Sequence, residues 1–445
     1  MPSRGASLLP VTVAALTFAT ISRGGFHWPQ GSLLAVILVL ACSAAPARSF
    51  RAIGPGLSAA GSLAAGLVAS AAANGWPQEA RQPLATLAIA VAALVVGRSL
   101  IVRGERHTLL AALALIGVLA AIIGMAGLAV HWYPLAMRAQ GIWRTSSTLT
   151  YANSAGAFLT LTLFAAIAVA SERRNGTSRM AVAVILAGLI TSLSRGGILG
   201  AAAGAAVVTV AGGRDLFRGL ARPAVAALIL SACLVPSIAS DRGRPLIAIV
   251  GLGVALAVAA TPRMRPGRRW RATGIAAAVM LTGCAVLLAS QNAGRLFESR
   301  LAPGSEDRIR TWHATWSAAM ERPLLGTGPG TFRIVEMNDD GAILTRYAHN
   351  EYLQAFAETG VGGVASIAVA LVILGGWMRR RRPGAGAERG IWALALGACV
   401  AFAAHSAVDF VWRIPVLVAI AFLWLSLCVI RPEGVIEDER SNDAA

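Results

Sequence analysis

Apolar segments near the length needed to cross a bilayer follow one another along almost the whole chain. A membrane helix needs about 20 mainly apolar residues. Fourteen candidate segments can be counted, at residues 8–22, 31–46, 53–74, 83–102, 108–131, 150–171, 180–194, 197–213, 223–240, 245–261, 273–290, 361–378, 391–408 and 413–430. Of the 445 residues, 13% are charged, against about 25% in ordinary soluble proteins. The sequence therefore predicts an all-α polytopic membrane protein with about 14 (12–14) transmembrane helices, and it excludes a soluble globular enzyme.

Positive charge in the connections between these segments predicts their orientation. The chain has no lysine, and its 39 basic residues are arginines that fall mostly between apolar segments. Placing the N-terminus inside the cell puts 23 of them on the cytoplasmic side, as the positive-inside rule requires. We therefore expect both termini to be cytoplasmic. The formal net charge of +18 then reflects topology and not a nucleic-acid partner.

One connection is much longer than the others. It divides the chain into an N-terminal transmembrane bundle at residues 1–290, a loop at 291–360, and C-terminal transmembrane helices with a cytoplasmic tail at 361–445. The topology places the loop outside the cytoplasm, and it holds nine of the 21 acidic residues. Long loops in compact folds are commonly functional, so we expect the chemistry here.

Two short helices are expected inside this loop. The first has Ser305 as its N-cap and ends before Pro323, and its apolar side chains recur at helical spacing. These are Ile309, Trp312, Trp316 and Met320. The pattern is typical of an amphipathic helix at a membrane interface. The second helix is predicted from Ala348 to Glu358, with Gly360 as its stop.

Between the two helices, Gly326, Gly328 and Gly330 form a glycine-rich segment. A phosphate-binding loop would need a preceding strand and a following Gly-Lys-Ser/Thr, and neither is present. A structural turn is the favoured interpretation. Within the bundle, small residues such as Gly61, Ala65 and Ala69 are expected to let helices pack closely.

Three arginines at the outer face are candidates for binding an anion. Arg195 lies in Ser-Arg-Gly-Gly where one apolar segment meets the next, and it either snorkels to the interface or binds an anion. Arg308 and Arg310 lie in the first turns of the first loop helix, near Trp312. A guanidinium pairs with phosphate oxygens bidentately. These arginines therefore either face solvent or hold a diphosphate.

Histidines supply the candidate proton acceptors. His349, followed by Asn350, begins the second loop helix and is either a general base or an exposed capping residue. His405 and Asp409 lie one helical turn apart near the outer end of the penultimate span. Polar pairs inside a membrane are functional candidates, although a structural hydrogen bond explains this pair equally well. No metal-ligand spacing is present in the loop.

These motifs together resemble the signature region of the O-antigen ligase and polymerase superfamily. The matching elements are Arg308-x-x-x-Trp312, the proline- and glycine-rich run 323–332, His349-Asn-Glu-Tyr-Leu353 and Glu358-Thr-Gly360, with Ser194-Arg-Gly-Gly197 upstream and His405-Ser-x-x-Asp409 downstream. They occur in the expected order over roughly the second half of the chain. One departure is an additional pair of apolar segments at 223–261, which weakens the choice of ligase over polymerase.

The resemblance implies a glycosyltransferase that is inverting and independent of metals and other cofactors. Its implied donor is a glycan on undecaprenyl diphosphate, and its acceptor is a glycan or lipid hydroxyl reached from the outer side of the membrane. The family's essential residues map onto Arg195, Arg308 and His349, with Arg310 as the alternative second arginine. Trp312, Asn350, His405 and Asp409 are then candidate substrate contacts.

A transporter or flippase for lipid-linked glycans is the competing class. Such proteins commonly show internal repeats and charges at the midplane of the bilayer. This sequence shows no clear repeat, and its ionisable residues gather instead at the outer mouth and in the loop. The sequence therefore favours an enzyme, with a polymerase of the same family as the nearest alternative.

Overall fold

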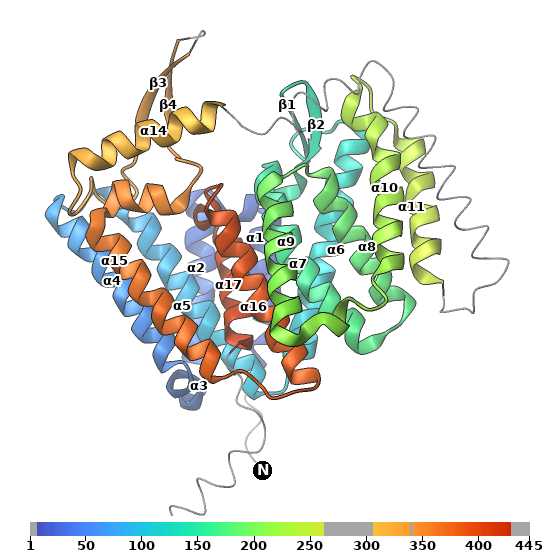
Figure 1. Ribbon diagram of the computed structural model, residues 1–445, viewed down its shortest axis with the longest axis horizontal. Coiled ribbons are helices and arrows are strands. Elements are labelled where there is room, and N and C mark those ends of the chain that lie inside the picture. The colour runs from blue at the N-terminus through green and yellow to red at the C-terminus, as the bar shows by residue number, and fades with distance from the viewer. Residues whose placement is uncertain (1–6, 262–305, 339–340, 429–445) are drawn as a thin grey trace, which may run out of the picture.

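The computed structural model describes residues 7–261, 306–338 and 341–428. Within them the chain forms a bundle of apolar helices (Figure 1). Eight helices are long and apolar enough to cross a membrane, and five are shorter. The long ones are α4 (Gly54–Ala73), α5 (Arg81–Val102), α6 (Arg106–Val130), α7 (Ala152–Arg173), α9 (Arg195–Val208, continued by π and 3₁₀ turns to Phe217), α10 (Ala221–Ala239), α15 (Glu351–Arg380) and α16 (Ala387–Ser406). The shorter ones are α1 (Leu9–Ile21), α2 (Trp28–Ser43), α8 (Gly176–Thr191), α11 (Pro245–Ala260) and α17 (Pro415–Leu427).

Each of these thirteen helices coincides with a predicted apolar segment. The remaining segment, at 273–290, lies outside the described residues, as do the loop residues 291–305. A helical membrane protein is therefore confirmed, and the count of 14 spans stays a prediction. A further short helix, α3 (Ala47–Ala52), connects α2 to α4.

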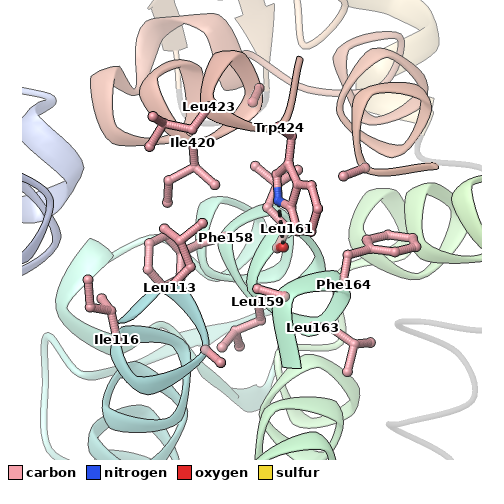
Figure 2. Packing of buried hydrophobic residues seen from close by; sticks show 14 of the residues in the cluster. Leu113, Ile116, Phe158, Leu159, Leu161, Leu163, Phe164, Ile420, Leu423 and Trp424 are labelled. Carbon is pink, nitrogen blue, oxygen red and sulfur yellow. Dashed lines mark hydrogen bonds between the residues drawn. The ribbon is translucent and has the colours of Figure 1, made fainter. Parts of the chain in front are cut away.

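In the core of the bundle, α17 packs against α7 (Figure 2), and its other main neighbours are α5 and α16. Trp424 of α17 is fully buried, and its indole N–H donates a hydrogen bond to the carbonyl oxygen of Leu161 in α7 at 3.1 Å. Ile420 of the same helix points toward Phe158, while Leu423 faces Gly97 of α5. Lipid provides no hydrophobic drive between helices, so this interlocking of shapes and the buried hydrogen bond hold α17 in place.

Glycines allow the closest approaches between helices, but not at the positions predicted. Gly200 and Gly204 of α9 face the backbone of α16, where a Cβ on Gly200 would lie 2.8 Å from the carbonyl oxygen of Ala401. On α4, Gly61 faces no atom within 4 Å, and Gly66 is the residue packed against Ser366 of α15. The prediction for Gly61 was wrong because periodicity alone does not show which small-residue face meets the protein and which meets lipid.

The extramembrane elements lie together at one end of the bundle (Figure 1). They are α14 (Glu306–Glu321) and two antiparallel hairpins, β1 (Ala136–Ala139) with β2 (Ile142–Thr145), and β3 (Ile334–Asn338) with β4 (Gly341–Thr345). The all-α prediction missed both hairpins. The turn between β1 and β2 places Gln140 and Gly141 at φ +52° and +79°, as a two-residue hairpin turn requires, but strands of four or five residues carry too little alternation to be recognised.

Helix α14 matches the first predicted loop helix in its described part, while the proposed N-cap Ser305 lies outside the described residues. It packs against α15 through Thr311, Thr315 and Ala319, which are buried. The apolar stripe behaves differently, because Ile309, Trp316 and Met320 are exposed. The helix therefore turns its small and polar face to the protein and leaves an apolar stripe uncovered, which suits the predicted place at a membrane interface.

The second predicted loop helix differs at both ends. Helix α15 begins at Glu351 and not at Ala348, because His349 adopts φ +51° and Asn350 caps the helix instead. Gly360 does not end it either. With φ +63° and ψ −165°, Gly360 breaks its direction, and helical turns continue as a span to Arg380.

The backbone of Gly360 packs against Leu324, and the backbone of Gly326 packs against Glu358. These contacts hold the loop against the first turns of α15. A Cβ on Gly360 would collide with the carbonyl carbon of Leu324, and one on Gly326 with that of Glu358. Four backbone hydrogen bonds join these segments, among them those from the amide of Val361 to the carbonyl of Pro323 at 2.8 Å and from the amide of Gly328 to the carbonyl of Glu358 at 2.9 Å. The glycine-rich segment is thus a structural turn.

Gly360→Ala is expected to lower the thermal unfolding midpoint of the purified protein in detergent. A side chain at this positive φ costs about 1–3 kcal/mol, and the collision with Leu324 adds to it. Gly375→Ala is the matched control, because Gly375 lies on the same helix with open space around it, and alanine there stabilises by about 0.5–1 kcal/mol. Equal midpoints for the two variants would contradict this account of the kink.

Candidate functional site

The carboxylate of Asp409 is the centre toward which polar residues converge at the end of the bundle that carries α14 and the hairpins. Asp409 follows α16 and is buried. Its Oδ1 lies 3.0 Å from Nδ1 of His349 and accepts a hydrogen bond from the amide of Phe410 at 2.9 Å. Its Oδ2 lies 3.7 Å from Nη2 of Arg308. Three residues named as candidates from the sequence, from α14, the loop and the end of α16, thus meet at one carboxylate.

Helix α7 supplies partners that sequence reasoning missed. The side-chain amide of Asn153 donates to Oδ2 of Asp409 at 2.5 Å, and the hydroxyl of Tyr151 lies 3.4 Å from the same oxygen. Asn153 is oriented by Arg144 of β2, which donates to its amide oxygen at 2.7 Å and to the carbonyl of Ser192 at 2.9 Å. The only sequence signal was polar residues at the mouth of an apolar segment, which does not identify their partner.

The charge on Asp409 is stabilised in spite of its burial. Burial by itself raises the pKa of the carboxyl, but the hydrogen bond to His349 and the positive charges nearby hold the pKa below its ordinary value. Such a carboxylate stabilises the fold at pH values above the unfolded pKa of about 3.9, and the contribution is lost as the pH falls through the lower folded pKa. Asp409 is therefore an anion across the neutral range.

His349 is held in a strained conformation that points its ring at Asp409. Its φ of +51° is uncommon for any residue other than glycine, and strain of this kind gathers at functional sites. Asn350 accepts hydrogen bonds from the amides of Tyr352 and Leu353 at 3.1 and 3.0 Å. The side-chain oxygen of Asn350 is thus used as a helix cap, so its predicted substrate contact has to come from the rest of the side chain.

Arg308, and not Arg310, is the arginine of α14 that reaches this centre. Its Nη1 donates to the carbonyl oxygen of Val408 at 2.9 Å, while Arg310 is exposed on the helix. Trp312 donates from its indole nitrogen to the carbonyl oxygen of Ala348 at 2.9 Å. Trp312 therefore ties α14 to the residue before His349, which is a positioning contact.

Arg195 begins α9 on the other side of the 405–409 segment. Its helix is capped by Ser194, whose hydroxyl accepts from the amide of Gly197 at 3.1 Å, and Leu193 just before adopts φ +49°. Gly196 packs against His405 and Val408, so closely that a Cβ there would lie 2.6 Å from Nε2 of His405. Gly196, the residue after Arg195, therefore contacts the 405–409 segment. In that same segment the carbonyl oxygen of Val408 accepts the hydrogen bond from Arg308.

His405, the first residue of the 405–409 segment, is buried, at 2% exposure. Neither of its ring nitrogens has a hydrogen-bond partner among the described residues. Its ring packs against Gly196, and it therefore supports the backbone next to Arg195. A substrate contact for His405 stays a prediction.

A second buried polar cluster fastens the loop to the bundle. Nη2 of Arg413 lies 3.0 Å from both carboxylate oxygens of Glu358, and its Nε lies 3.7 Å from Glu351. Glu358 also accepts from the amide of Gly330 at 2.7 Å and from Gln354 at 2.8 Å. Burial opposes the charge of Arg413, but the two carboxylates hold its pKa above the ordinary value. Arg413 and its pairing with Glu358 could not be predicted, because the two residues lie 55 positions apart and no local pattern links them.

An apolar groove of about 350 Å³ opens beside this cluster and runs down the bundle. It is lined by side chains of α4, α5, α15, α16 and α17, from Tyr352 and Trp412 at its outer end to Met378 at its inner end. Arg413 and Glu351 also line it. The groove therefore joins a hydrocarbon-like interior to the charged outer mouth.

The described residues include no group of three or more His, Cys, Asp or Glu side chains that could hold a metal ion. Positive charge at the site comes instead from arginine side chains. The arrangement can orient an imidazole, balance negative charge with guanidinium groups and accommodate an apolar chain beside them.

Arg413→Gln is expected to destabilise the protein strongly, because it leaves Glu358 buried without its counterion. Breaking a buried pair in this way costs about 3–5 kcal/mol. The control is Arg333→Gln, which removes the partner of Glu79 in an exposed pair at 3.1 Å, where the cost is about 0–1 kcal/mol. Thermal unfolding in detergent measures both, and similar midpoints would contradict the anchoring role of Arg413.

Comparison with known families identifies the region that contains much of this site. A family model for O-antigen ligase matches residues 240–368, a range that includes Arg308 and His349 and leaves out Arg195 and Asp409. A search of curated proteins found no match. Residues 240–368 of this chain are therefore similar to the O-antigen ligase family, in agreement with the resemblance seen in the sequence.

Proposed function

We propose that this protein transfers a glycan from undecaprenyl diphosphate to an acceptor hydroxyl at the outer face of a bacterial inner membrane, by an inverting and metal-independent mechanism. The observation that carries the proposal is the convergence of His349 and Arg308 on Asp409, at the end of the bundle where the apolar groove opens. The family match supports ligase- or polymerase-type chemistry. Both termini are then cytoplasmic, and the loop is extracytoplasmic.

His349 is the proposed general base. Because Asp409 is a carboxylate that can only accept, the proton of the neutral imidazole lies on Nδ1, 3.0 Å away, and Nε2 keeps its lone pair. That nitrogen can take the proton of the acceptor hydroxyl as its oxygen attacks the anomeric carbon. Asp409 is a positioning residue that fixes the tautomer and stabilises the imidazolium that forms.

Arg195 and Arg308 are proposed to bind the diphosphate of the donor. As the bond between the anomeric carbon and the phosphate oxygen breaks, negative charge grows on the leaving diphosphate. Two guanidinium groups placed in advance can stabilise that charge without a metal ion. The hydrogen bond from Arg308 to Val408 at 2.9 Å supports this role, because it holds part of the guanidinium in a fixed orientation.

The apolar groove is proposed to hold the polyprenyl chain. Its lining by Leu67, Ile367 and Leu374 suits a hydrocarbon, since a chain that enters from the bilayer exchanges one apolar environment for another and gains close packing contacts. The charged outer end of the groove would then leave the diphosphate near the loop. A polymerase differs from a ligase only in its acceptor, so both remain compatible with this arrangement. A transporter is disfavoured, because the charged groups gather at one mouth and not at the midplane.

Replacing the three proposed catalytic residues is expected to abolish transfer while the protein stays folded in the membrane. Arg195→Ala and Arg308→Ala should each lower kcat by about 10²–10³-fold, and His349→Ala by about 10²–10⁴-fold. Transfer from a purified undecaprenyl-diphosphate glycan, followed by gel or mass spectrometry, measures this. Arg138→Ala is the control, because Arg138 is paired with Asp241 in an exposed ion pair on the same face. Wild-type transfer by all three variants would refute the mechanism.

The Asp409→Asn variant tests whether Asp409 positions His349 for catalysis or only helps the protein to fold. An asparagine keeps the shape but can present its NH₂ group to His349, which favours the wrong tautomer, so kcat should fall by about 10²-fold or more with little change in the KM for the donor. Asp241→Asn, at the exposed carboxylate, should change neither constant. A fall in donor affinity with kcat unchanged would assign Asp409 to substrate binding instead.

A further inference from the structure

A polar pocket to which the residue roles proposed above assign nothing lies where α2 and α5 begin. Its volume is about 340 Å³. The first residue of α2, the turn before α5, Gly330 of the glycine turn and the bases of β3 and β4 line it. The pocket is therefore built jointly by the bundle and by the loop that carries His349.

The pocket has an excess of positive charge. Four arginines and one glutamate line it. Arg413 is neutralised by Glu358, and Arg333 pairs with Glu79 at 3.1 Å. Arg81 and Arg346 have no carboxylate within ion-pairing distance among the residues that the structure describes. These two guanidinium groups, one at the start of α5 and one just after β4, can pair with an anionic group that enters from solution.

The other lining residues are of the kinds that recognise sugars. Gln354 and Arg413 are buried, at 2% and 8% exposure, and present fixed polar groups to the pocket. Trp28, Phe332 and Tyr347 supply aromatic surface, and Gln78 and Gln82 supply amides. An aromatic ring covers the apolar face of a sugar, while amides and guanidinium groups bond its hydroxyl and acidic groups. A small inorganic anion would use few of these groups.

A single aromatic ring, that of Phe410, lies between Tyr347 of the pocket and His349. Tyr347 lines the pocket and stacks on Phe410, with ring centroids 4.4 Å apart. Phe410 in turn meets the ring of His349 edge-on at 5.1 Å. Arg413 lines both this pocket and the apolar groove, so the two cavities meet at its side chain. A glycan in the pocket would therefore lie close to Tyr347 and, through Phe410, to His349.

We propose that this pocket is the acceptor subsite and that it binds an acidic sugar, one carrying a carboxylate or a phosphate, of the acceptor glycan. Arg81 and Arg346 bind the acidic group, and Trp28 stacks on the ring. The proposal rests on the proposed function for the meaning of acceptor, but the binding site itself can be tested without any turnover.

Binding is measured by isothermal titration calorimetry on the full chain in lipid nanodiscs, with three soluble probes. These are tri-galacturonate, its neutral carboxyl-reduced counterpart, and galactose 6-phosphate. We expect tri-galacturonate to bind at least tenfold more tightly than the neutral trisaccharide, and the double variant Arg81→Gln, Arg346→Gln to remove that difference. Binding of galactose 6-phosphate in preference to tri-galacturonate assigns the acidic group as phosphate, and the reverse assigns it as carboxylate. Equal binding of acidic and neutral probes overturns the proposal.

Three controls keep this test specific. Arg242→Gln changes an exposed arginine in the outer connection between α10 and α11 and should leave binding unchanged. Trp28→Ala should weaken the trisaccharide several-fold. Tri-glutamate tests charge alone, and if it binds as tightly as tri-galacturonate, the pocket attracts anions without recognising sugars and the proposal fails.

Transfer assays distinguish failure of the pocket from failure of the proposed function. His349→Gln should bind tri-galacturonate normally while transferring nothing. With an acidic acceptor, Arg81→Gln with Arg346→Gln should raise the acceptor KM at least tenfold and leave the donor KM unchanged. A raised donor KM instead overturns the acceptor assignment. If the wild type transfers no glycan but binding behaves as expected, the sugar site stands and the proposed reaction falls.

Discussion

The carboxylate of Asp409 is buried where the bundle meets the outer surface, and a buried charge persists only if its surroundings compensate for lost water. Here the compensation comes from residues far apart in sequence. His349, Arg308 and Asn153 reach it from the loop, from α14 and from the first turn of α7. The need to satisfy one carboxylate therefore fixes three separate elements relative to one another, and those are the elements that carry the proposed chemistry.

The loop could not present His349 in this way without its second anchor. Arg413 and Glu358 form a buried ion pair that joins the segment before α17 to the head of α15, and the kink at Gly360 locks the glycine turn beside it. The bundle below is held by close packing and by bonds such as that between Trp424 and Leu161, since lipid offers no hydrophobic drive. A closely packed bundle of apolar helices thus supports a polar site at one of its ends.

The sequence was informative wherever a local pattern carries the signal. Apolar segments of spanning length predicted thirteen described helices, and the family motifs identified Arg308, His349 and Asp409 before any coordinates. The sequence could not show which of these residues contact each other, because His349 and Asp409 are 60 residues apart and no local pattern links them. Arg144 and Asn153 were missed for the same reason. The β1–β2 hairpin and the start of α15 were missed because they depend on residues at positive φ, Gln140 and His349. The strands of both hairpins are also too short to show a clear alternation.

The most direct test of the account is an experimental structure of the full chain in nanodiscs with undecaprenyl diphosphate bound. The account predicts the diphosphate between the guanidinium groups of Arg195 and Arg308, with the polyprenyl chain in the groove beside Tyr352 and Ile367. A diphosphate bound away from both arginines, or a lipid chain outside that groove, would contradict it.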